Sequence, residues 1–195
     1  MNKDPILSTP SLSTANQQDW TALGFKFGDK GAHTSRTMML KELSALFQHC
    51  PSDATRSDYA VAITEENLLG KHTLSMRQLT VQRLSELYAL EPAVPLFRLL
   101  RYFWDADEKA QPQLALLTAM ARDPLLRATA AVVMDTVEGE DLARNRLTEA
   151  LRQATEGRFN DNTLDKVVRN TASSWTQSGH FIGRSHKRRT RISPT

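Results

Sequence analysis

Residues 162–179 read NTLDKVVRNTASSWTQSG, and this stretch indicates an α-helical fold. Its apolar side chains recur at intervals of three or four residues, which is the period of an α-helix that packs on one side. Asn162 or Thr163 is a favourable N-cap, and Gly179 is a favourable stop. We therefore predict a helix to about Gln177 that docks on the body of the protein. The apolar stripe comprises Leu164, Val167, Val168, Thr171 or Ala172, and Trp175.

The same helical period extends over most of the chain, and the alternation that is typical of β-strands is nearly absent. We therefore predict an all-α protein with the architecture of a compact helical bundle. Only residues 179–183 suit a short extended or turn segment. The predicted N-caps are Thr34 or Ser35, Ser57 or Asp58, Ser75, and Asp123, which precedes Pro124. The other predicted helices cover residues 35–50, 58–69, 75–90, 94–105, 113–121, 124–137 and 140–154.

Proline, glycine and charge patterns divide the chain into four parts. Residues 1–34, with scattered apolar anchors, are predicted to form an arm over the body with one helical turn around Gln17 to Leu23. Residues 35–105 and 113–183 form two helical halves, because the acidic, proline-containing stretch between them is the best candidate boundary. Residues 184–195 form a basic tail.

Composition excludes several classes of protein. The 195 residues are 40% hydrophobic and 24% charged, which is ordinary for a globular chain. No apolar run approaches the roughly 20 residues of a membrane span, and no export signal begins the sequence, so we expect a cytoplasmic protein. The single Cys50 builds neither a disulfide framework nor a zinc site. Because no nucleophile, phosphate-loop or metal-ligand motif occurs, we expect a protein that is not an enzyme and has no cofactor or metal.

Charge is distributed unevenly. Seven of the 25 lysines and arginines follow Asp165, and none of the 22 acidic residues does. Such asymmetry is typical of chains that bind a polyanion such as nucleic acid or an acidic membrane surface. The plainer interpretation is that the basic tail only keeps the protein soluble. An extended tail beginning at Arg184 would reach roughly 40 Å along a phosphate backbone.

Two helix pairs have the layout of a helix-turn-helix. In residues 140–178 a glycine-containing turn leads into a helix with a polar outer face. Arginine, lysine and amide side chains on such a helix read base edges in a major groove about 12 Å wide. Counted with the tail, the candidate DNA contacts of this part are Thr163, Lys166, Arg169, Asn170, Ser173, Gln177, Arg184, Lys187, Arg188, Arg189 and Arg191.

Residues 58–90 form the second candidate pair. An ordinary αα-hairpin explains this pattern equally well, so both interpretations stay open. Its candidate DNA contacts are Lys71, Arg77, Gln78, Gln82 and Arg83.

Several local runs resemble the BrxA family, small core proteins of BREX bacteriophage-exclusion systems. They are Asn67 to Lys71, Leu87 to Leu90, Pro95 to Phe97, Asn162 to Leu164, Ser174 to Phe181 and Lys187 to Arg189. The resemblance covers Thr34 to the C-terminus. These runs are short stretches of sequence similarity and do not include a catalytic motif. It implies an all-helical protein with helix-turn-helix elements that binds duplex DNA within a methylation-based defence system. The implied binding surfaces are residues 71–83 and 163–191.

From the residues and the resemblance together we predict a double-stranded DNA-binding accessory protein that assists DNA methylation or phage restriction. We expect it to be monomeric, to lack a membrane partner, and to contact other subunits such as the methyltransferase. One alternative is a protein-interaction adaptor that bridges defence subunits, in which the tail only solubilises. Another is an RNA-binding helical protein, because compact basic helical proteins also hold structured RNA.

Overall fold

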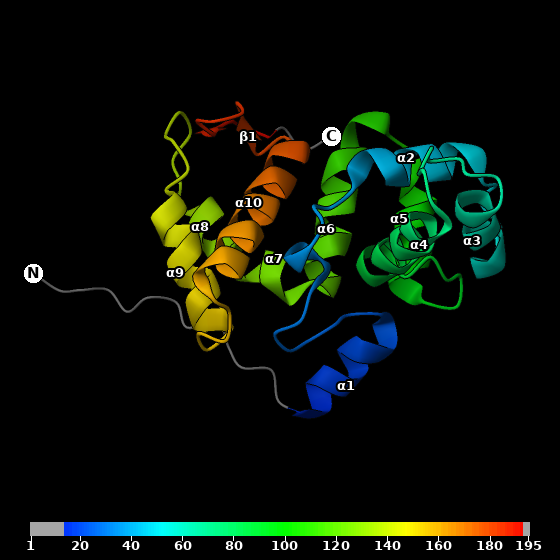
Figure 1. The fold of residues 1–195 in the computed structure, drawn as a ribbon, viewed down its shortest axis with the longest axis horizontal. Coiled ribbons are helices and arrows are strands. Elements are labelled where there is room, and N and C mark those ends of the chain that lie inside the picture. Colours follow the sequence, from blue (N-terminus) through cyan, green and yellow to red (C-terminus); the bar gives the residue numbers. More distant parts are fainter. Residues whose placement is uncertain (1–13, 193–195) are drawn as a thin grey trace, which may run out of the picture.

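The computed structural model describes residues 14–192, so part of the predicted arm, residues 1–13, and the last three residues of the tail lie outside it. The described chain is almost entirely helical, which confirms the all-α prediction (Figure 1). The helices are α1 Thr14–Leu23, α2 Leu40–His49, α3 Arg56–Thr64, α4 Leu74–Tyr88, α5 Pro95–Trp104, α6 Gln111–Arg122, α7 Pro124–Ala128, α8 Ala130–Met134, α9 Arg144–Ala154 and α10 Asp161–Gln177, with short 3₁₀ turns at Ala32–Thr34 and Glu108–Ala110.

Two groups of buried side chains form the core. The larger group joins α2 to α6 with Trp175 of α10, so it draws on both sides of residues 105–112. The smaller group lies between α7, α8, α9 and α10 and includes Leu147, Leu151 and Val167. Trp104 and Trp175 are both fully buried core residues. Helix α6 lies in the middle of the molecule (Figure 1) and contributes Ala115, Leu116 and Ala119 to the larger group.

In the first half, several helix starts differ from the prediction. Helix α2 begins at Leu40, not near Ser35, because residues 36–39 are not helical and Met39 adopts a left-handed conformation with φ 54°. Helix α3 is capped by Thr55, and Asp58 is the third helical residue that completes a capping box. Helix α4 is capped by Thr73 rather than Ser75.

Helix α3 also ends earlier than predicted. It stops at Thr64, and residues 65–73 connect it to α4. Asn67 and Gly70 have positive φ values of 53° and 60° there, which an α-helix does not allow. The pair α3–α4 is therefore an αα-hairpin with a connection longer than the three or four residues of a helix-turn-helix.

In the second half, Asp123 and Pro124 open α7 as predicted, and the Asp123 carboxylate accepts hydrogen bonds from the amides of Leu125 and Leu126. The predicted helix to Val137 is broken at Thr129. The Thr129 hydroxyl donates to the Leu126 carbonyl and accepts from the Trp175 indole, so this residue serves the packing of α10 instead of continuing the helix.

The last hairpin forms, but with different limits. Helix α9 begins at Arg144 rather than Glu140, and α10 is capped by Asn160 rather than by Asn162 or Thr163. Two short strands follow, β1 Phe181–Ile182 and β2 Arg188–Arg189, which pair antiparallel beside the C-terminal end of α10 (Figure 1). A bridge between Asp141 and Arg188 adds the segment before α9 to this pair.

Candidate nucleic-acid interface

A basic groove runs between α9, α10 and the loop that joins β1 to β2. Its volume is about 620 Å³, and its charged lining consists of Arg144, Arg169, Arg184 and Lys187. No aspartate or glutamate lines it. Leu147 and Val168 contribute to an apolar floor. A groove of this kind attracts anions, because its four cations produce a positive electrostatic potential and no carboxylate lines the groove to cancel it.

One acidic residue at the rim reduces this potential. Asp165 lies 2.5 Å from a guanidinium nitrogen of Arg144 and 3.2 Å from Nε of Arg169. All three side chains are more than half exposed, so water and salt screen the two pairs. Arg144 and Arg169 therefore keep unused guanidinium donors that a phosphate oxygen can accept.

Four predicted contacts are exposed and form no ion pair with any described residue: Lys166, Arg184, Arg188 and Arg191. Lys187 is held more tightly, because its ammonium group donates to the hydroxyl of Thr176 at 2.9 Å. Partial burial lowers the pKa of Lys187 from its ordinary value.

The predicted free tail is wrong for residues 184–190. Arg189 exchanges backbone hydrogen bonds with Glu140 and Gly139, and its guanidinium donates to the carbonyl oxygens of His180 and Thr190. The carbonyl oxygen of Lys187 accepts from the amide of Leu142. These bonds tie the basic segment to the body, so an arm that reaches 40 Å from Arg184 does not exist in this conformation.

The predicted outer face of α10 is only partly free. The Asn170 amide donates to the carbonyl oxygen of His33 at 2.8 Å, and the Gln177 side-chain oxygen accepts from the amide of Leu40 at 3.2 Å. Each side chain therefore uses one of its two polar groups on the backbone at or before the start of α2, and that group is not free to read adenine. Thr163 and Ser173 are half-buried, and Ser173 lines the basic groove.

The N-terminus of α10 is occupied by polar side chains of the protein itself. Asn160 caps it by accepting from the amide of Thr163, and Asp161 occupies its first turn. A negative side chain in the first turn is favourable at the positive end of the helix dipole and disfavours a second anion such as a phosphate there.

Most of the predicted contacts on the α3–α4 hairpin are bound within the protein. Lys71 pairs with Glu42 at 3.2 Å, and Arg77 donates to the Thr64 carbonyl oxygen at 2.6 Å. Gln82 and Arg83 both donate to the carboxylate of Glu86. Gln78 alone of this set is exposed and shows no side-chain hydrogen bond to a described residue. The hairpin thus presents much less free charge than the sequence predicts.

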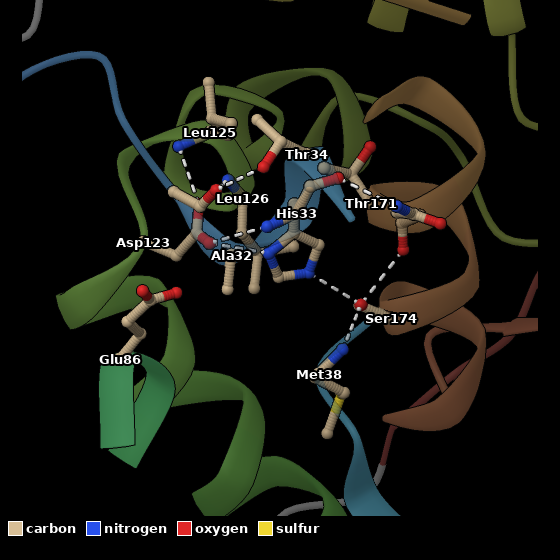
Figure 2. Close-up of polar contacts among 12 residues, drawn as sticks. Ala32, His33, Thr34, Met38, Glu86, Asp123, Leu125, Leu126, Thr171 and Ser174 are labelled. Atoms are coloured by element: carbon tan, nitrogen blue, oxygen red, sulfur yellow. Dashed lines mark hydrogen bonds and ion pairs between the residues drawn. The ribbon is translucent and has the colours of Figure 1, made fainter. Parts of the chain in front are cut away.

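A buried cluster that the sequence did not predict joins three distant segments (Figure 2). His33 Nδ1 lies 2.8 Å from the Asp123 carboxylate, and its Nε2 lies 2.8 Å from the Ser174 hydroxyl. This order of groups matches a hydrolase triad, but all three side chains are at most 1% exposed. The hydroxyl of Ser174 also accepts from the amide of Met38 and donates to the Asn170 carbonyl oxygen, so no substrate reaches it. The cluster therefore holds these three segments together. Only Asp123 has a signal in the sequence, as the N-cap before Pro124.

The chain matches no protein-family model and no curated protein sequence. Among residues 14–192, no helix combines the length and apolarity that a membrane span requires. The same residues contain no group of histidine, cysteine and acidic side chains placed to hold a metal ion. Cys50 is buried and unpaired by a disulfide.

Proposed function

We propose that this protein binds double-stranded DNA without chemical catalysis and acts as an accessory to DNA methylation or phage restriction. The observation that carries the proposal is the basic groove between α9, α10 and the β1–β2 loop, which four cationic side chains line without a carboxylate. The resemblance to the BrxA family supplies the setting in phage defence.

Phosphate contacts dominate in this proposal. The two amides best suited to read bases, Asn170 and Gln177, are committed to backbone groups of the protein. Arg169, Arg184 and Lys187 instead present charge along one groove, and such contacts position a duplex without specifying its sequence. We therefore expect binding that depends weakly on DNA sequence and strongly on salt.

A gel-shift series tests this function. The purified protein is titrated with duplex DNA, duplex RNA and single-stranded DNA of equal length at several salt concentrations. The proposal expects duplex DNA to bind best, with an affinity that falls steeply as salt rises. Preference for duplex RNA would support the RNA-binding alternative, and no shift at low salt with any of the three would contradict nucleic-acid binding.

The adaptor alternative draws on a different surface. Leu99 of α5 and Leu117 of α6 line one apolar cavity and are 56% and 62% exposed, and Tyr102 of α5 is 76% exposed. Large apolar side chains exposed together are typical of an interaction surface. Copurification with a partner methyltransferase after nuclease treatment, together with loss of that copurification in Leu99→Ser/Leu117→Ser, would favour the adaptor. Copurification that nuclease abolishes would favour DNA as the link.

A further inference from the structure

A second basic cavity lies apart from the basic groove, where α1 and the following residues 24–34 face α4 and α6. Its volume is about 730 Å³. Five of its lining residues are basic and one is acidic: Lys26, Lys30, Arg83, Arg122, Arg158 and Glu86. We call it the arm crevice. A concave site of this size suits a small ligand.

Arg122 forms the buried part of the arm crevice. It is 9% exposed, and its guanidinium donates to the carbonyl oxygens of Gly24, Ser85 and Glu86. It forms no ion pair with any carboxylate of the described chain, although buried charges are normally paired. Burial lowers the pKa of Arg122 to about 10. A positive charge is therefore held at the crevice by neutral groups alone.

The neighbouring lysines lack anionic partners as well. Neither Lys26 nor Lys30 forms an ion pair with a described residue, and the side chains of both reach solvent. The pKa of Lys26 is lowered from its ordinary value, first by partial burial and then by the charge of Arg122. The positive charges of Lys26 and Arg122 thus disfavour one another, while Glu86 and Asp123 act on Lys26 in the opposite direction. A bound anion would favour the charged lysine further.

Three other charged residues that line the crevice, Glu86, Arg83 and Arg158, are already engaged in ion pairs. The single acid, Glu86, already accepts from Arg83 at 2.6 Å and from Gln82 at 2.9 Å. Arg158 is paired with Asp29 at 2.5 Å. Arg83 keeps a buried Nε donor that has no hydrogen-bond partner in the described chain. The lining of the arm crevice therefore holds one buried guanidinium donor that is unused.

Aromatic side chains complete the wall. Phe25 and Phe27 both line the arm crevice and are half-buried. The guanidinium of Arg127 lies 5.4 Å from the centre of the Phe27 ring, which fixes that ring in place. A positive floor beside flat apolar walls is complementary to a molecule that carries both a phosphate group and a ring.

We propose that the arm crevice binds a small phosphorylated molecule of the nucleoside phosphate class, with its phosphates at Lys26, Lys30 and Arg122 and its ring beside Phe25 and Phe27. This site does not depend on the proposed DNA function, because none of these residues lines the basic groove. Ligand binding would also hold residues 24–34 against α4 and α6, since the crevice is built from both sides.

Isothermal titration with adenosine diphosphate, pyrophosphate and adenosine tests the proposal. We expect adenosine diphosphate to bind most tightly and adenosine at least about tenfold more weakly, because it lacks the phosphates. The variant Lys26→Gln/Lys30→Gln is expected to weaken adenosine diphosphate binding about tenfold or more. The matched control Lys41→Gln/Lys109→Gln removes two exposed lysines outside the crevice and is expected to change the affinity less than twofold.

Thermal unfolding and duplex DNA gel shifts of both variants accompany the titrations. Unchanged unfolding temperature and DNA affinity in Lys26→Gln/Lys30→Gln, with weaker nucleotide binding, would support a separate ligand site. No binding of adenosine diphosphate by the wild type up to about 5 mM would overturn the proposal. Loss of DNA affinity without any effect on nucleotide binding would overturn it too, because the crevice lysines would then serve a DNA backbone. Failure of the wild type to bind DNA would leave the titration result intact, so the two proposals fail separately.

Discussion

Asp123 is the residue on which the position of the arm depends. Its carboxylate accepts from the backbone amides of His33, Leu125 and Leu126 and from the imidazole of His33. The side chain is 1% exposed, so these four donors replace all of its hydration. The same group therefore caps α7 and fastens the 3₁₀ turn of the arm to the body (Figure 2).

Replacing Asp123 by asparagine is expected to lower the free energy of unfolding by about 3 kcal/mol, because an amide can accept fewer of these bonds and carries no charge. Urea unfolding measures the loss. Asp135→Asn is the control, since Asp135 forms an exposed ion pair with Arg146 at 2.9 Å. This substitution is expected to lower the free energy of unfolding by less than about 1 kcal/mol. Equal losses in the two variants would contradict a fastening role for Asp123.

His180 is a residue that we expect to make the stability of the folded protein depend on pH. Burial and then the charge of Arg189 lower its pKa from 6.5 to about 4. Between these values the unfolded chain binds a proton that the folded chain does not, so stability falls as the pH is lowered through this interval. We expect the unfolding temperature of His180→Asn to depend less on pH between 6.5 and 4 than that of the wild type. Parallel curves would show that His180 does not carry this dependence.

Among the helices, α10 illustrates how one element serves two purposes. Leu164, Val167 and Trp175 bury one stripe against the body, and the remaining circumference is shared between the segment before α2 and the basic groove. Asn170 and Gln177 face the first of these surfaces, and Arg169 and Ser173 face the second. The polar face is therefore part structure and part candidate interface.

Substituting Asn170 and Gln177 distinguishes the structural part of the polar face of α10 from its candidate DNA contacts. Asn170→Ala and Gln177→Ala are each expected to lower the free energy of unfolding by about 1 kcal/mol, because a backbone partner is left without its hydrogen bond. Their affinity for duplex DNA is expected to stay within twofold of the wild type, as measured by gel shift. A large loss of affinity with unchanged stability would instead restore these amides as DNA contacts.

Local sequence predicts the helices well where their signals are local. The apolar stripe of α10 and the Asp123–Pro124 start of α7 depend on neighbouring residues, and both are predicted correctly. The partners of Asn170 and Gln177 lie 137 residues away in the chain, so periodicity cannot identify them. The same limit applies to Arg189, whose backbone pairs with Glu140 and ties down a segment that composition describes only as a basic tail.

Across the whole molecule, the positive charge that the sequence places near the C-terminus is partly retained as an exposed surface. Lys166, Arg184, Arg188 and Arg191 remain unpaired in the described chain, and Asp165 screens Arg144 and Arg169. The arm crevice adds a second basic region. Counting charges near the C-terminus does not reveal it, because its cations come from four separate segments of the chain. Folding therefore gathers charges that are scattered in the sequence into two basic concave regions.

The salt dependence of duplex DNA affinity decides whether the basic groove binds phosphates. It is measured for the wild type, for Arg169→Gln/Arg184→Gln in the basic groove, and for the control Lys41→Gln/Lys109→Gln outside it. The groove variant is expected to bind more weakly and to reduce the slope of log affinity against log salt by about 0.9 for each phosphate that the protein no longer neutralises, whereas the control keeps the wild-type slope. Identical slopes for all three proteins would contradict a phosphate-binding role for the groove.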